Sequence, residues 1–347
     1  MIEAHTRPLR VETLKAKHFS VLASICPSER LDSLQLMLIN NWLGQVEKAL
    51  GNWLPATKSI CLVAFEYESP IAIAVAKPCN KRGSCWSINF PDLILEPKES
   101  SLSLIQKSLL QKALEIGKNR VQSWLIRTQT NDKILLEIAR EYGFQPLKFF
   151  NCWSSKSTKM GFGGLSTPND SKYEWQKINK ENVSALYRFE LASQSSLHRQ
   201  ILDRQLKDLL QVGKNVNGVL ISKRSDSNNA IAGLILREMT EDILKVELLR
   251  DLAWDERIIG GIPYLLKELD KGKRNILIET SKDDEKLSDL LHKLGNKFEY
   301  ETILLGRSLW RRQENRELIR MTNKLESILG GLRPQNPPLP TPSLDPR

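Results

Sequence analysis

Long apolar runs and the common catalytic signatures are missing from this sequence of 347 residues. Its apolar stretches, such as Ile71 to Ala76, are far shorter than the roughly 18 residues that span a bilayer. The opening MIEAHTRPLR has no apolar segment of the secretory type, so we expect no secretory signal and no membrane partner. The sequence also lacks GxSxG, a P-loop GKS/T, GxGxxG after a strand and HExxH, which argues against the enzyme classes that these motifs mark.

Cysteine and histidine are few and scattered. The five cysteines include no CxxC pair, and an odd number does not suit a disulfide framework, so we interpret them as reduced thiols of a cytoplasmic protein. The four histidines stand far apart in the sequence, which argues against a zinc site, and we predict no metal. With 41% hydrophobic residues the chain has enough apolar side chains for ordinary buried cores, and its length is typical of two domains.

Positive charge is in excess, with a formal net charge of +10. The excess falls before residue 161 and after residue 300, whereas residues 161–300 carry equal numbers of acidic and basic side chains. Such an excess attracts nucleic acid, an anionic membrane face or a phosphorylated cofactor. Because the sequence has no dense run of Lys and Arg, a solvated basic surface explains the excess better, and RNA is a partner that we do not favour.

Apolar periodicity predicts the same order of strands and helices twice. In the first half the predicted elements are a strand at 7–14, helices at 15–25 and 30–50, strands at 58–67, 71–77 and 85–95, a helix at 101–117, a strand at 121–128, a helix at 132–141 and a strand at 144–153. In the second half they are a strand at 173–178, helices at 181–192 and 197–210, strands at 216–223, 230–238 and 243–250, a helix at 260–269, a strand at 275–280, a helix at 284–294 and a strand at 298–305.

The two halves are related as repeats of one long unit. Val121 matches Asn275 and Gly143 matches Gly295, about 150–160 residues apart. A spacing this long indicates a duplicated domain rather than a solenoid. We therefore predict an α/β protein with two domains in tandem, at residues 1–155 and 173–310, each with a mixed central sheet flanked by helices.

Three further segments differ from these domains. Residues 156–172, KSTKMGFGGLSTPNDSK, are rich in Gly, Ser and Pro without any period, which predicts a linker. Residues 311–331 have apolar side chains at helical spacing and end in two glycines, which predicts an amphipathic C-terminal helix. Residues 332–347 form a Pro-rich tail, which we expect to be disordered.

A glycine pair opens the predicted helix that follows the strand at 243–250, within the string DERIIGGIPYLLKEL. This string and the element order resemble the GNAT superfamily of N-acetyltransferases, over about residues 6–155 and 173–306. In that family an Arg/Gln-x-x-Gly-x-Gly/Ala pattern after the fourth strand opens a helix, and its backbone N–H groups hold the pyrophosphate of acetyl-CoA. The resemblance therefore implies that the cofactor acetyl-CoA binds at the positions matching this pattern, which are Arg257, Gly260, Gly261 and Ile262.

This candidate loop departs from the family pattern at two positions. Ile262 stands where Gly or Ala is expected, and its branched Cβ is expected to obstruct the phosphates. Pro263 lacks an N–H group, although proline is well tolerated in a first helical turn. A helix cap with two glycines is the alternative explanation of the string, and it needs no cofactor.

The first half keeps less of the pattern at the same place. Residues 95–102, LEPKESSL, contain no glycine, so the resemblance implies a degenerate cofactor loop there. Further along, Asn131 and the segment Tyr142-Gly143-Phe144 resemble the Asn and Gly-Phe of the family, whose Asn meets the pantetheine arm of the cofactor. Asn131 stands one residue away from the usual spacing.

Catalytic residues are not evident in the sequence. Many members of the family use a Tyr four residues before that Gly as general acid for the departing thiolate, but the two positions here hold Ala139 and Leu291. Tyr142 and His292 are neighbours in number only, since one residue along a helix is a rotation of about 100°. Glu247 is the carboxylate available as a general base, and on an alternating strand it faces either solvent, the more frequent outcome, or the substrate cleft. We assign no catalytic residue.

The resemblance implies an N-acyltransferase that moves an acetyl group from acetyl-CoA to the amine of a small molecule or a protein. Two alternatives stay open. The missing general acid favours a catalytically inactive tandem scaffold that only binds. Another duplicated relative, the Fem-type peptidyltransferases, uses aminoacyl-tRNA, and a basic first half suits RNA.

Overall fold

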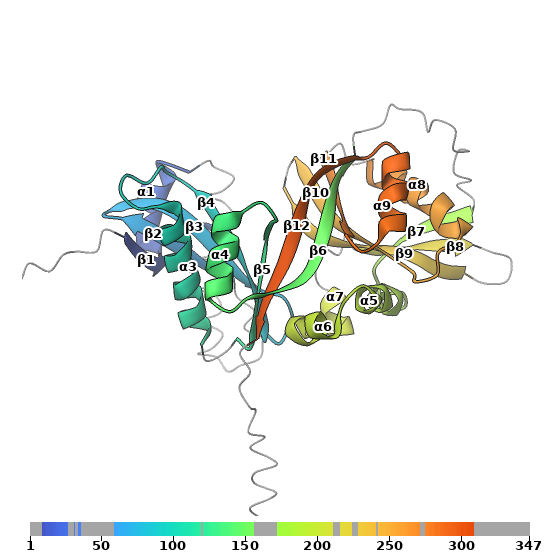
Figure 1. The fold of residues 1–347 in the computed structure, drawn as a ribbon, viewed down its shortest axis with the longest axis horizontal. Helices are drawn as coiled ribbons and strands as arrows, with labels where there is room; N and C mark the ends of the chain where they lie inside the picture. The colour runs from blue at the N-terminus through green and yellow to red at the C-terminus, as the bar shows by residue number, and fades with distance from the viewer. Residues whose placement is uncertain are drawn as a thin grey trace, which may run out of the picture. The chain divides into compact units, whose positions relative to one another are not determined.

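A computed structural model gives the fold of the chain (Figure 1). It describes residues 9–26, 31, 34–35, 59–118, 121–155, 172–210, 216–223, 228–240, 242–270 and 275–308, all within the compact unit Met1–Leu309. The predicted C-terminal helix and Pro-rich tail, the predicted linker except Lys172, and most of the predicted helix at 30–50 lie outside these residues. Among the residues that are described, no helix has the length and hydropathy that a membrane crossing requires.

The described elements follow the predicted order in both halves and confirm the α/β class, with a mixed sheet flanked by helices. The first half contains β1 (Leu9–Thr13), η1 (Ala16–His18), α1 (Phe19–Ala23), β2 (Ile60–Glu66), β3 (Ser69–Pro78), β4 (Cys85–Leu93), α3 (Leu102–Gly117), β5 (Ser123–Gln129), α4 (Lys133–Glu141) and β6 (Gln145–Ser155). The second half contains β7 (Tyr173–Lys177), α5 (Val183–Ala192), α6 (Ser196–Leu202), α7 (Leu206–Leu209), β8 (Gly218–Lys223), β9 (Asn228–Met239), β10 (Ile243–Arg250), α8 (Glu256–Asp270), β11 (Asn275–Ser281), α9 (Glu285–Lys293) and β12 (Lys297–Ser308).

All of the described strands belong to one sheet, in the order β1-β2-β3-β4-β5-β12-β6-β11-β10-β9-β8-β7. β12, which ends the second half, lies between β5 and β6 of the first half, and β6 lies between β12 and β11. β4 pairs with β5 and β10 pairs with β11 in parallel, while the other neighbours in this order are antiparallel. Each half therefore completes its part of the sheet with the last strand of the other half (Figure 1).

Equivalent residues of the two halves meet near the centre of this sheet. Phe150 of β6 stands opposite Thr302 of β12. Arg127 of β5 and Glu279 of β11, which are separated in sequence by the same 152 residues as Phe150 and Thr302, form an ion pair that reaches across β12 and β6. The guanidinium of Arg127 lies 4.1 Å from the centre of the Phe150 ring. The register therefore has an approximate twofold symmetry centred between β6 and β12.

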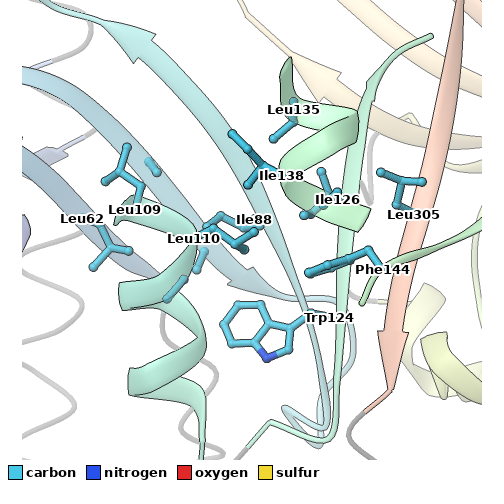
Figure 2. Close-up of a cluster of buried hydrophobic side chains, with 14 of the residues drawn as sticks. Leu62, Ile88, Leu109, Leu110, Trp124, Ile126, Leu135, Ile138, Phe144 and Leu305 are labelled. Carbon is cyan, nitrogen blue, oxygen red and sulfur yellow. The ribbon is translucent and has the colours of Figure 1, made fainter. Parts of the chain in front are cut away.

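Helices cover both faces of the sheet. Successive side chains along a strand point to opposite faces, so the strands present apolar side chains on both faces, and the helices pack on each of them. α3 and α4 pack on β2 to β5 and also on β12, and Figure 2 shows Leu305 of β12 beside Ile126 and Phe144. α8 and α9 pack on the second half in the same way. On the other face, α1 packs on β2 and β3, and α5 and α7 pack on β8 to β10. α6 of the second half packs instead on β5, β12 and β6.

The single helix predicted at 197–210 is in fact two helices. Asp203 has a φ of 47°, in the left-handed region, and ends α6, so that α7 begins only at Leu206. Asp adopts this conformation more readily than most residues. Its carboxylate accepts hydrogen bonds from Ser84 Oγ (2.7 Å) and from Arg82, both in the loop between β3 and β4. The break therefore places a polar contact between the two halves.

Candidate functional site

The parallel strands of each half separate toward their carboxyl ends. In the second half, β10 and β11 pair as far as Glu247 and Glu279, and β10 then continues to Arg250 beside β9 alone. In the first half, β4 and β5 separate after Ile88 and Ile126. Each separated pair is followed by a loop and the N-terminus of a helix, which is the edge of an α/β sheet where ligands commonly bind.

The helix after β10 begins earlier than predicted. α8 starts at Glu256, so Gly260 and Gly261 lie inside it, where backbone N–H groups bond to carbonyls of the preceding turn and cannot meet a phosphate. A Cβ on Gly260 would lie 2.5 Å from Tyr173 Oη, and a Cβ on Gly261 would lie 2.8 Å from Ile231 Cδ1. The predicted location of the phosphate loop is therefore corrected: the two glycines allow α8 to approach the sheet closely.

The neighbouring positions of the predicted cofactor loop have different surroundings. Ile262 is fully buried in the core under α8, so its side chain does not obstruct the loop. Pro263 lies inside α8 rather than in its first turn, where it leaves a carbonyl of the preceding turn without its helical partner. Arg257 lies in the first turn, and its Nε donates to Asp255 Oδ2 over 2.7 Å, which lowers the pKa of Asp255. Arg257 is thus the predicted residue that stands at the helix start.

The loop between β10 and α8 carries backbone donors that are not used. N–H groups without an acceptor in the described part of the chain belong to Leu252, Trp254, Asp255 and Glu256. Leu252 is 76% exposed, so this loop reaches solvent. Free N–H groups at the positive end of a helix dipole suit a negatively charged group such as a phosphate.

Arg250, the last residue of β10, fixes the shape of this loop. Its guanidinium donates to the carbonyl oxygens of Asp251 (2.7 Å) and Leu252 (3.2 Å), and it lies 5.0 Å from the ring centre of Trp254. It also donates to both carboxylate oxygens of Asp284, over 2.7 and 2.9 Å, at the start of α9. Arg250 therefore joins the loop to α9 across the separated ends of β10 and β11. This role of Arg250 could not be predicted from the sequence, because a charged residue at a strand end has no distinctive pattern.

The corresponding loop of the first half is filled by a carboxylate of the protein itself. Glu66, the last residue of β2, accepts hydrogen bonds from the N–H groups of Lys98 (2.7 Å), Glu99 (3.0 Å) and Ser100 (2.7 Å). Glu66 is buried, and these bonds, with that from Lys98 foremost, lower its pKa to about 2. The backbone donors before α3 therefore already hold an internal anion.

The positions singled out for acid chemistry do not supply it. Ala139 and Leu291 are buried in the cores under α4 and α9. Tyr142 packs at the edge of the first core, whereas His292 and Asn131 are exposed. None of these five residues lies where it combines with another to form a proton-transfer pair.

Glu247 is buried, contrary to the expectation that it more often faces solvent. Arg237 Nε lies 2.8 Å from its Oε2, and Lys148 Nζ lies 3.3 Å from its Oε1. Burial raises the pKa of Glu247, but Arg237 and Lys148 lower it by more, so the pKa stays well below its ordinary value. A carboxylate held by two cations is a poor proton acceptor, so we do not treat Glu247 as a general base.

Several solved structures similar to this chain are described as acetyltransferases or as a GNAT protein. No protein-family model and no curated protein matches the sequence. A GCN5-related N-acetyltransferase from Sphaerobacter thermophilus matches with a TM-score of 0.50 and 9% identity, over 87% of this chain and 96% of that one. A putative acetyltransferase from Pyrococcus horikoshii matches with a TM-score of 0.50 and 12% identity, over 89% and 92%. A tandem GNAT protein from the clavulanic acid biosynthesis pathway matches with a TM-score of 0.50 and 10% identity, over 88% and 100%.

These matches extend over both halves of the chain and nearly the whole of each similar protein. At such low identity the likeness concerns the fold. It agrees with the repeated element order and with the parallel pairs β4–β5 and β10–β11. The chain therefore has the fold of the GCN5-related N-acetyltransferases, the GNAT fold, present twice in tandem.

Proposed function

We propose that the chain is an N-acyltransferase that binds acetyl-CoA with its second half. The observation that carries this proposal is the contrast between the two loops. The N–H groups of Lys98, Glu99 and Ser100 before α3 are bonded to Glu66, whereas those of Leu252, Trp254, Asp255 and Glu256 have no acceptor in the described part of the chain. The first loop thus holds a carboxylate that comes from another strand, whereas the carboxylates bonded in the second loop are its own Asp251 and Asp255, which accept from the N–H groups of Ala253 and Arg257.

The residues around the second loop suit a pyrophosphate group. The free N–H groups donate to phosphate oxygens, and Arg257 at the start of α8 adds a positive charge. Asp255 competes for Arg257, so phosphate binding requires Arg257 to share or exchange this partner. When bound, acetyl-CoA supplies a thioester whose acyl group passes to an amine: a C–N bond forms, the C–S bond breaks, and one proton moves from the amine to the leaving thiolate.

The described residues offer no assigned acid or base for that proton. Ala139 and Leu291 are core residues, and Glu247 is held by Arg237 and Lys148. Proton transfer by a positioned side chain contributes about 10²–10⁴-fold in rate, whereas holding two reactants together contributes more. We therefore expect an enzyme that works mainly by positioning its two substrates, with a modest rate.

Titration calorimetry with acetyl-CoA tests the proposal on the full chain. Ala253→Asp places a carboxylate in the second loop, on an exposed residue between Leu252 and Trp254. Glu66 already places a carboxylate in the corresponding loop of the first half. Repulsion of the phosphates should weaken binding by roughly tenfold or more. The matched control is Ser101→Asp at the N-cap of α3, where Asp caps equally well and binding should be unchanged.

Two results would overturn the proposal. Equal loss of binding in both variants would show that the second loop has no special role. A wild-type chain that binds no acetyl-CoA would instead be an inactive tandem scaffold.

A further inference from the structure

Six charged side chains from both halves gather where β10 and β11 separate. We call them the central charge cluster, and they are Arg127, Lys148, Arg237, Lys245, Glu247 and Glu279. Arg127 and Lys148 come from β5 and β6 of the first half, and the others come from β9, β10 and β11 of the second. Glu247 and Glu279 are the last residues that β10 and β11 pair, so the cluster lies at the point of separation.

The central charge cluster has more cations than carboxylates. Arg237 and Lys148 bind Glu247, while Arg127 and Lys245 bind Glu279, so four positive groups face two negative ones. The adjacent ion pair on the helix side, Arg204 with Glu190, is neutral as a whole and adds no balancing charge. Among the described residues the cluster thus carries a surplus of two positive charges, which is unfavourable at low exposure unless an anion joins it.

The two arginines of the cluster, not its carboxylates, reach toward solvent. The side chains of Glu247 and Glu279 are 3% and 0% exposed, but those of Arg127 and Arg237 are each 22% exposed. Arg127 bonds only through Nη1, and Arg237 only through Nε and Nη2, so each guanidinium keeps a terminal nitrogen without an acceptor in the described part of the chain. These free donors are accessible to a small anion from outside.

A buried histidine beside the cluster is also unsatisfied. His198 of α6 is buried, and its Nδ1 has no hydrogen-bond partner among the described residues. Burial lowers its pKa to about 3, and the charges that act on it include Glu247, Lys148 and Arg237, so the ring is neutral. It is a second polar group that a bound ligand can satisfy.

The described residues of the first half form no such cluster at the equivalent place. There the same face of the sheet is covered by an apolar core, which contains Cys85, Leu125, Phe150, Ile201, Leu202 and Leu304. Ile201 and Leu202 belong to α6, which closes this face over β5, β12 and β6. The cluster therefore lies at the strand ends of the second half, the half that keeps free donors in its cofactor loop, while the two cations in surplus, Arg127 and Lys148, come from the first half.

We propose that the central charge cluster binds the carboxylate of the acceptor, so that the acceptor is a small amine of the amino-acid type. That this amine accepts an acyl group rests on the function proposed above, whereas the binding of its carboxylate to the cluster does not. A planar guanidinium pairs with a carboxylate through two parallel hydrogen bonds, which suits Arg127, whose Nε and Nη2 have no acceptor among the described residues. Arg237, which already bonds to Glu247 through Nε and Nη2, can add a single bond through Nη1. The low exposure of the cluster favours a small ligand over a side chain presented on a protein surface.

Binding of succinate by the full chain tests the anion site without relying on acyl transfer. We expect calorimetry at constant ionic strength to detect binding of succinate to the wild type. Putrescine, a diamine without a carboxylate, should not bind. Arg127→Gln and Lys245→Gln should each weaken succinate binding by roughly tenfold or more. In each variant Glu279 keeps one cation and Thr302, so both should fold. Lys282→Gln removes an exposed cation outside the cluster and should bind succinate as the wild type does.

The outcomes separate this inference from the proposed function. Succinate binding that Arg127→Gln leaves unchanged, or binding of inorganic phosphate but not succinate, overturns the carboxylate site. Acetyl-CoA binding without succinate binding overturns this inference alone. Succinate binding without acetyl-CoA binding supports the anion site and overturns the acceptor role. Faster acetylation of L-glutamate than of putrescine by the wild type, with the preference lost in Lys245→Gln, supports the whole proposal.

Discussion

Leu305 gives a direct test of the interleaved sheet. It lies on β12, in the second half of the sequence, yet its side chain is 4% exposed in the core of the first half, with Ile126 and Phe144 (Figure 2). β12 is held on both sides by β5 and β6, so the backbone cannot shift to fill a cavity. Leu305→Ala should therefore lower the free energy of unfolding by roughly 3–5 kcal/mol, the upper part of the range for such truncations.

Urea unfolding measures this loss, and hydrogen exchange shows where it occurs. Exchange should become faster in α3 and α4, which pack on Leu305, and not in α8 and α9, which pack on a separate core. The control Leu252→Ala makes the same chemical change at a residue that is 76% exposed, and it should cost less than about 0.5 kcal/mol. A loss below about 1 kcal/mol for Leu305→Ala, or faster exchange confined to α8 and α9, would refute the reasoning.

Two further predictions concern Glu66 and the linker. The pKa of Glu66 is lowered from 4.5 to about 2, so its contribution to stability is fully present above pH 4.5 and is lost as the pH falls toward 2. The difference in urea stability between the wild type and Glu66→Gln should therefore shrink over that range, and a constant difference would contradict the assignment. Limited trypsin digestion should cut first within residues 156–172. Because β6 and β12 each lie between strands of the other half, the two fragments should elute together until denatured, and fragments that separate in native buffer would argue against the shared sheet.

The order of elements could be predicted because it depends on local patterns. The strand at Ile243–Arg250 has the predicted bounds, and most other described strands and helices differ from their predicted bounds by a few residues. The break at Asp203 is an exception, since its carboxylate bonds to Arg82 and Ser84 of the other half, which a local pattern does not show. The exchange of β6 and β12 is not visible in the sequence, because apolar alternation shows which face a side chain takes and not which strand lies beside it.

The candidate site was harder to predict for the same reason. A pair of glycines fits both a phosphate loop and a close contact, and only the position of Tyr173 shows that Gly260 serves packing. Glu66 and Glu247 are ordinary strand carboxylates in the sequence, and their roles depend on partners far along the chain. The sequence places Arg257 just before the predicted helix, and it lies in the first turn of α8, beside Asp255. Its role in binding a cofactor stays a prediction.

Arg127 and Glu279 occupy equivalent positions in the two halves and contact each other. In a symmetric dimer of two identical halves, the residue at this position would therefore contact the same residue of the partner. Two arginines or two glutamates reaching over the Phe150 ring would repel each other where solvent screening is weak. A fused chain is free of this constraint, because each copy of the gene segment can change independently. The opposite charges thus favour association of the first half with the second over association of like halves, and they would direct two separately expressed halves toward the mixed pair.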